Sequence, residues 1–235
     1  MARAALAVLL LALAAPASAQ IAPHLIPEVG AVSRADALDR VIGETLDSLT
    51  VDGHSFAVDR GVIARWVSVG VGSPDTWVMA VRETPDGYVG LWALGSPWYD
   101  GRDEDGRWSA GVARRVPYRT GSASLDSALA RAIGATWEVA VLGTRHQQPE
   151  EFSPFTAMDG SSAYYARWIE GYGVTSGWSR AALDGTPAQR LGRLSGMLFG
   201  YLHSDHRDEA SRDELLAEAR EVFQAFDSPS PSRRP

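Results

Sequence analysis

The stretch that decides the fold runs from Val62 to Leu94 and reads VIARWVSVGVGSPDTWVMAVRETPDGYVGLWAL. Its three runs rich in Val and Trp, at 62–69, 76–83 and 88–94, are typical of β-strands. Turn residues separate the runs, and Pro85-Asp86-Gly87 is the clearest hairpin signal among them. These features predict an antiparallel meander.

The sequence after this stretch continues the sheet and adds helices. Apolar residues of one parity predict a fourth strand at 107–118 and leave the meander with one wet side. A helix is expected at about 124–135, followed by a strand at 137–142. Strands at 162–170 and 174–178 form a predicted hairpin around Gly171-Tyr172-Gly173.

Two amphipathic helices are predicted near the C-terminus. Thr186-Pro187-Ala188-Gln189 combines a capping box with proline at the first helical position, and Ser211-Arg212-Asp213-Glu214 repeats the capping pattern. The first helix carries small residues every four positions, at Ala188, Gly192, Gly196 and Gly200. Three glycines cost roughly 2 to 3 kcal/mol of helix propensity, so we expect close packing against this stripe, within the domain or in a dimer.

The N-terminal part is predicted to hold one more helix. It begins at Ser33, carries an apolar face and ends at Asp52-Gly53. Residues 20–32 are expected to form an extended lead-in, and residues 227–235 a disordered tail. The sequence thus predicts one α+β domain over 33–226, an antiparallel sheet with amphipathic helices packed on a face, two of them C-terminal.

Residues 1–19 have the pattern of a secretory signal peptide. Arg3 precedes an apolar run, and Ala17-Ser18-Ala19 is a small-residue cleavage site before Gln20. The run is too short to span a bilayer, which disfavours a retained anchor, and no cysteine follows it that could carry a lipid. The sequence predicts an exported protein, periplasmic or extracellular, that is not a lipoprotein.

Composition excludes several classes of chemistry. The chain has no cysteine, and all 22 residues counted as Lys or Arg are Arg. Thiol nucleophiles, thiolate metal sites, Schiff-base lysines and P-loop lysines are therefore absent. Removal of Arg3 with the signal segment would change the formal net charge from −7 to −8, which disfavours nucleic acid as a partner. No further apolar run predicts a membrane span in the mature chain.

One segment has the residue types of a metal site. His203, His206 and Asp208 lie close together in sequence, and zinc or manganese accepts such ligands. Complementarity with the ends of two helices explains the same charges without a metal. Because no metal signature such as HExxH is present, we expect no metal and no other cofactor.

The long stretch at 144–160 is the first place to look for a site, because it shows no periodicity. Residues in or at the end of this loop that could act as general acid or base are His146, Glu150, Glu151 and Asp159. The simpler explanation is that these side chains are solvated and have no catalytic role.

Eight tryptophans are the last signal, and strand positions predict that most of them are core residues. Trp98 and Tyr99, beside Gly95 and Pro97, are the aromatic residues most typical of a surface loop that stacks on a ligand.

The function that these features favour is binding without catalysis. Each catalytic candidate also has a simpler structural explanation, so binding is favoured over catalysis. The expected partner is an envelope protein, a glycan or a small molecule. The alternative is a hydrolase that acts on an envelope polymer or a small ester with residues of the 144–160 loop.

Overall fold

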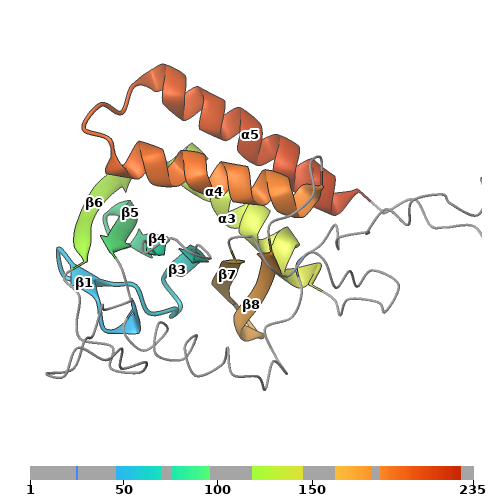
Figure 1. Cartoon of the computed structure of the whole chain (residues 1–235), viewed down its shortest axis with the longest axis horizontal. Helices are drawn as coiled ribbons and strands as arrows, with labels where there is room; N and C mark the ends of the chain where they lie inside the picture. The colour runs from blue at the N-terminus through green and yellow to red at the C-terminus, as the bar shows by residue number, and fades with distance from the viewer. Residues whose placement is uncertain are drawn as a thin grey trace, which may run out of the picture.

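A computed structural model of the chain describes Leu25 and residues 46–69, 76–95, 118–144, 162–180 and 186–228. These residues form an α+β fold in which α3, α4 and α5 lie on one side of an antiparallel sheet (Figure 1). The sequence predicted this fold class. The elements are β1 (Thr50–Val51), β2 (His54–Ser55), β3 (Val62–Val69), β4 (Thr76–Thr84), β5 (Gly87–Gly95), β6 (Arg119–Leu125), α3 (Ser127–Leu142), β7 (Ser162–Ile169), β8 (Gly173–Arg180), α4 (Pro187–His203) and α5 (Glu209–Asp227).

The main sheet has six strands in the order β6-β5-β4-β3-β7-β8, and every neighbouring pair is antiparallel. The predicted meander of β3, β4 and β5 and the predicted hairpin of β7 and β8 are confirmed. Gly171 and Gly173 flank the tight turn of that hairpin with φ of 80° and 79°, a conformation that other residues adopt at a cost.

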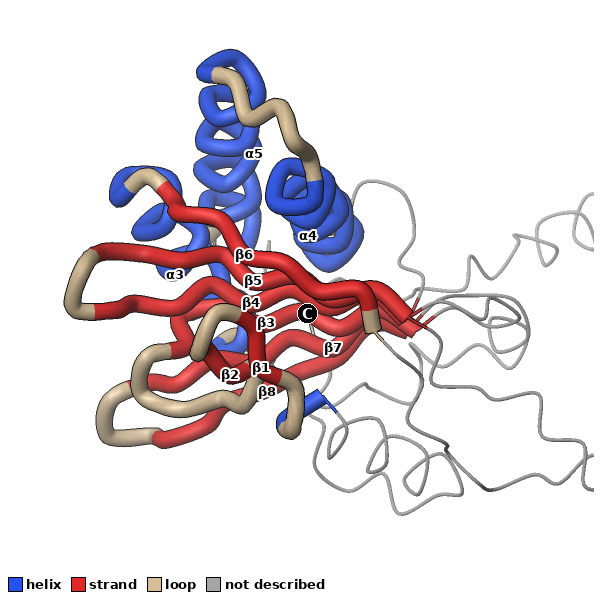
Figure 2. Tube along the Cα trace, turned by 90° about the vertical axis from the view of Figure 1, so that its left-hand side faces the viewer, coloured by secondary structure: helices blue, strands red, loops and turns tan. Residues whose placement is uncertain are grey.

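Both faces of the central strands are buried, which corrects the expectation of a wet side. In β4 the four consecutive residues Val78 to Val81 are fully buried. Met79 and Val81 pack under the helices, whereas Val78 and Ala80 belong to a second core with Leu46 and Phe56. Leu46, Leu49, Val51 and Phe56 pack against that second face, and the β1–β2 hairpin lies on the side of the sheet away from the helices (Figure 2).

The helix α3 corrects the local prediction for residues 124–142. It begins at Ser127, where the Asp126 side chain accepts hydrogen bonds from the backbone N–H groups of Ala128 and Leu129, and it continues to Leu142. The Trp- and Val-rich end at 137–142 was expected to be a strand, yet it stays helical because Trp137 and Val141 extend the buried stripe of the helix. Ser124 and Leu125 belong instead to β6, a strand that the sequence analysis missed.

The two C-terminal helices are confirmed, with one corrected cap. Thr186 caps α4 as expected, because its side chain accepts from the N–H of Gln189 and Pro187 follows it. The α5 cap is Asp208 rather than Ser211, since the Asp208 carboxylate accepts from the N–H of Ser211 at 2.7 Å. Helix α5 extends to Asp227, the first residue of the predicted tail.

The glycine stripe of α4 does not pack as expected. A Cβ atom at Gly196 or Gly200 would meet nothing within 4 Å, and one at Gly192 would make only an ordinary contact, 3.5 Å from Tyr165 Oη. Helix α4 packs instead through its leucine face, which is fully buried at Leu191, Leu194, Leu198 and Leu202. Close packing along the stripe within the domain is therefore not found among the described residues, and packing in a dimer stays a prediction.

Asp52-Gly53, expected to end the first helix, forms the turn of the β1–β2 hairpin. Asp52 has φ of 49° and Gly53 has φ of 80°, the positive pair that a type I′ turn requires and that Asp-Gly favours. The rest of the predicted first helix before Leu46, the signal segment and the tail from residue 229 lie outside the described residues. So does the predicted 107–118 strand apart from Tyr118, and of the predicted lead-in only Leu25, which is buried, is described. None of the described helices is long and apolar enough to cross a membrane.

Candidate functional site

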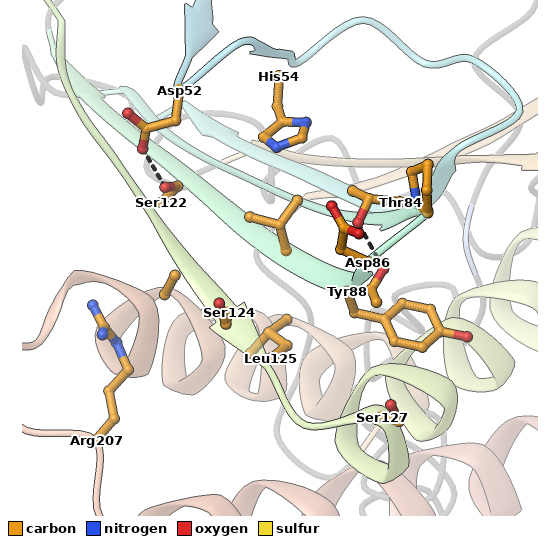
Figure 3. Close-up of a pocket in the computed structure, with 14 residues that line it drawn as sticks. Asp52, His54, Thr84, Asp86, Tyr88, Ser122, Ser124, Leu125, Ser127 and Arg207 are labelled. Atoms are coloured by element: carbon orange, nitrogen blue, oxygen red, sulfur yellow. Dashed lines mark hydrogen bonds between the residues drawn. The ribbon is translucent and has the colours of Figure 1, made fainter.

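A pocket of about 680 Å³ opens beside the edge strand β6. Its walls come from the β1–β2 hairpin, the β4–β5 turn, β6 and the connection between α4 and α5 (Figure 3). The volume lies within the roughly 300–1,000 Å³ typical of small-molecule sites. Most of the side chains that line it are polar, so hydrogen bonding is the chemistry available there.

The first wall depends on a contact between residues far apart in sequence. The hydroxyl of Ser122, on β6, donates a hydrogen bond to the Asp52 carboxylate (Figure 3). Ser122 faces this side of the sheet because it lies opposite Leu91, whose side chain belongs to the second core. The bond fixes the hairpin to the edge strand, and the same hairpin brings His54 to the pocket.

The β4–β5 turn supplies a second carboxylate. Thr84 Oγ1 donates to the backbone carbonyl of Gly87 at 3.1 Å and closes the turn around Asp86. Asp86 lines the pocket from a different side than Asp52 (Figure 3). Two carboxylates from separate turns therefore face one cavity.

Arg207 brings a positive charge, and the last turn of helix α4 takes two of its five N–H donors. Its Nε donates to the carbonyl of Tyr201 and its Nη2 to that of Leu202, each at 3.2 Å. These carbonyls belong to the last turn of α4, where such groups have no partner within the helix. Arg207 thus completes the helix end.

The lining of the pocket combines hydrogen-bond donors and acceptors with an excess of negative charge. The hydroxyl protons of Ser122 and Thr84 are already donated within the protein, and Arg207 donates two of its five N–H groups to α4. The carboxylates of Asp52 and Asp86 keep oxygens that can accept further hydrogen bonds. Counting His54 as neutral, the two carboxylates outnumber the single guanidinium, so the lining carries a net negative charge.

The geometry does not form a nucleophilic triad in the part of the chain that is described. Ser122 donates to a carboxylate, and within the described ranges no serine of the pocket donates to His54. A serine nucleophile requires a base that removes its proton in the reaction, usually a histidine oriented by a third group. The arrangement present is suited to holding a ligand.

The catalytic and surface candidates from the sequence cannot be placed in this pocket. His146, Glu150, Glu151 and Asp159 lie outside the described residues, as do Trp98 and Tyr99. The hydrolase alternative, which depends on the 144–160 loop, stays a prediction.

Two of the three candidate metal residues, His203 and Asp208, have other partners. Arg119 Nη2 lies 3.2 Å from His203 Nε2, and Asp208 caps α5. The pKa of Asp208 lies below its usual value because the N–H of Ser211 donates to the carboxylate. Across the described ranges, no group of three or more His, Asp or Glu side chains is arranged to hold a metal ion.

The pocket residues themselves were missed by the sequence reasoning. Only the turn around Asp86 was identified, and only as a hairpin. The Asp-Gly pair at 52–53 was a usable hairpin signal, but nothing in the sequence connects it to Ser122.

Comparison of the chain with known protein families, with curated proteins and with solved structures finds no match. The described structure is that of an α+β protein with a helix-covered antiparallel sheet and a polar pocket, negatively charged overall, at the edge of that sheet.

Proposed function

We propose that the protein is exported and binds, without transforming it, a small ligand rich in hydrogen-bond donors. The observation that carries the proposal is the net negative charge of the pocket lining, with the carboxylates of Asp52 and Asp86 on different sides of it. Export rests on the signal-peptide pattern of residues 1–19.

An organic amine satisfies this pocket better than a neutral polyol. A polyol hydroxyl can donate to either carboxylate, but it leaves the excess negative charge of the lining uncompensated. A protonated amine donates to the same oxygens and compensates the charge, and charge-assisted hydrogen bonds are roughly twice as strong as neutral ones.

The test is titration calorimetry of the purified protein with spermidine as the amine and sorbitol as the polyol. Spermidine should bind and sorbitol should bind more weakly. Asp52→Asn and Asp86→Asn should each weaken spermidine binding by about tenfold, because each removes one charged acceptor. Asparagine tolerates the positive φ of Asp52 and can still accept from Ser122.

The matched control is Asp205→Asn, an exposed aspartate that does not line the pocket. It changes the net charge equally and should leave binding unchanged. Equal weakening by all three substitutions would show that the effect comes from overall charge and would contradict the proposed site.

Export is checked separately by mass spectrometry of the native protein, which should begin near Gln20; recovery of a chain that begins at Met1 would contradict export.

A further inference from the structure

A row of three side chains crosses the other face of the sheet. In the strand register Trp77 lies opposite Leu94, and Leu94 lies opposite Arg119. Residues directly opposite each other share a face, and two strand spacings separate Trp77 from Arg119 by about 10 Å. This is the helix face, because Trp77 contacts Phe199 and Arg119 contacts His203, both from α4.

Trp77 is exposed but held in place. Its ring stacks on Phe199 with centroids 5.5 Å apart and planes 16° apart, yet 43% of the residue is exposed. Phe199 is itself buried and makes edge contacts with Trp66 and Trp92. One face of the indole therefore rests on a buried aromatic ring, and a large part of the residue remains accessible to solvent.

Arg119 brings an uncompensated positive charge to the other end of the row. It is exposed, and in the part of the chain that the structure describes no carboxylate forms an ion pair with it. Its contact with His203 Nε2 at 3.2 Å requires the histidine nitrogen to accept, since arginine only donates. The ring of His203 is fixed by stacking on Phe199, so it orients Arg119 without neutralising it.

We propose that Trp77, Phe199, His203 and Arg119, which we call the Trp77 patch, bind a sugar ring with an attached carboxylate, as in a uronic acid. The apolar face of the sugar stacks on the indole of Trp77, and the carboxylate accepts from Arg119. The patch has a single exposed arginine, which matches one carboxylate. The net charge of −7 on the chain would repel a polyanion.

The Trp77 patch is separate from the pocket. Arg119 faces the helices, whereas Ser122, three residues along the same strand, faces the hairpin side. The inference therefore stands or fails independently of the proposed amine site, and substitutions at one site serve as controls for the other.

The experiment compares cellobiouronic acid with cellobiose, which has a primary alcohol in place of the carboxylate, by calorimetry and tryptophan fluorescence. The acidic disaccharide should bind more tightly, and Arg119→Gln should reduce its affinity by about tenfold while leaving that for cellobiose unchanged. Trp77→Ala should weaken both sugars. Tyr172→Ala, which removes a 75% exposed aromatic residue elsewhere, and Asp86→Asn should change neither.

Three results would overturn the inference. The first is no saturable binding of cellobiouronic acid up to about 10 mM. The second is equal affinity for the two sugars in the unsubstituted protein. The third is binding of an acidic peptide that depends on Arg119 when neither sugar binds, which would identify a protein partner instead.

Discussion

The pocket and the Trp77 patch are built in different ways. The pocket lies beside β6 at the β4–β5 turn, and residues from both sides of the sheet line it, whereas the Trp77 patch lies on the helix face toward the other end of the strands. The patch is fixed by strand register and by α4, which packs on it through buried aromatic contacts. The pocket lies between two turns, and a hydrogen bond between Asp52 and Ser122 fixes its hairpin wall to β6. Because the core supports the patch, ligand binding there should be lost mainly through substitutions of buried residues. Binding in the pocket should be weakened by single substitutions of polar residues.

The largest effect that separates the two sites is expected from Phe199→Ala. Phe199 is buried and supports both Trp77 and His203, and loss of a buried Phe typically costs about 3–5 kcal/mol. Denaturant unfolding should show this loss. Below the unfolding midpoint, uronic acid binding should disappear while spermidine binding remains; simultaneous loss of both would mean that the two sites are not independent.

The next effect is a change in stability that has opposite signs when two different glycines are replaced by alanine. A Cβ at Gly121 would lie 2.6 Å from the indole of Trp92, so Gly121→Ala should overpack the helix face and destabilise by about 1–3 kcal/mol. Gly196→Ala on α4 meets nothing within 4 Å and should stabilise by up to about 1 kcal/mol, because alanine is the better helix former. Thermal unfolding of the pair checks both, and a destabilised Gly196→Ala variant would restore the close-packing hypothesis.

A smaller effect is expected from Ser122→Ala, which removes the link between hairpin and edge strand. The expected loss of stability is about 0.5–1.5 kcal/mol, toward the lower end because the bond is exposed. Spermidine binding should weaken, and uronic acid binding should not change. Ser124→Ala is the control, since it lies on the same strand and in the same pocket but makes no bond to Asp52; equal weakening by both variants would contradict the role given to the link.

The smallest effect concerns acidification of the hairpin side. Burial raises the pKa of Asp59, but hydrogen bonds from Arg82 and from the N–H of Gly61 outweigh it, so the pKa lies below its usual value. A lowered pKa contributes stability above the unfolded-state value, and this stability is lost as pH falls through the folded-state value. Arg82 also donates to the carbonyls of Ser55 and Ala57, so protonation of Asp59 should loosen the segment next to β2.

We expect a slight fall in stability below about pH 4, and this part of the pH dependence should be absent in Asp59→Asn. Because Asp59 is half exposed, the change is expected to be small. An unchanged pH profile in that variant would assign the effect to other carboxylates.

The elements that the sequence predicted well are those specified by neighbouring residues. The strands predicted at 62–69 and 76–83 and the N-terminal cap of α4 follow from β-branched runs, turn residues and capping side chains, all local effects. The errors occurred where local preference and tertiary packing disagree. Residues 137–142 have strand composition but complete a buried helical stripe, and β6, with Thr, Gly and Ser, has little strand signal before it pairs with β5.

The candidate sites depend on tertiary structure more than the secondary-structure elements do. The sequence by itself determined the α+β class, the β4–β5 and β7–β8 hairpins, the C-terminal helices and the absence of thiol and lysine chemistry, because these depend on residue type and short-range pattern. Only the tertiary structure decided that Asp52 meets Ser122, that Trp77 shares a row with Arg119, and that the glycines of α4 face open space. Each of these depends on strand order and register, which are set by long-range pairing and by burial of two apolar faces at once.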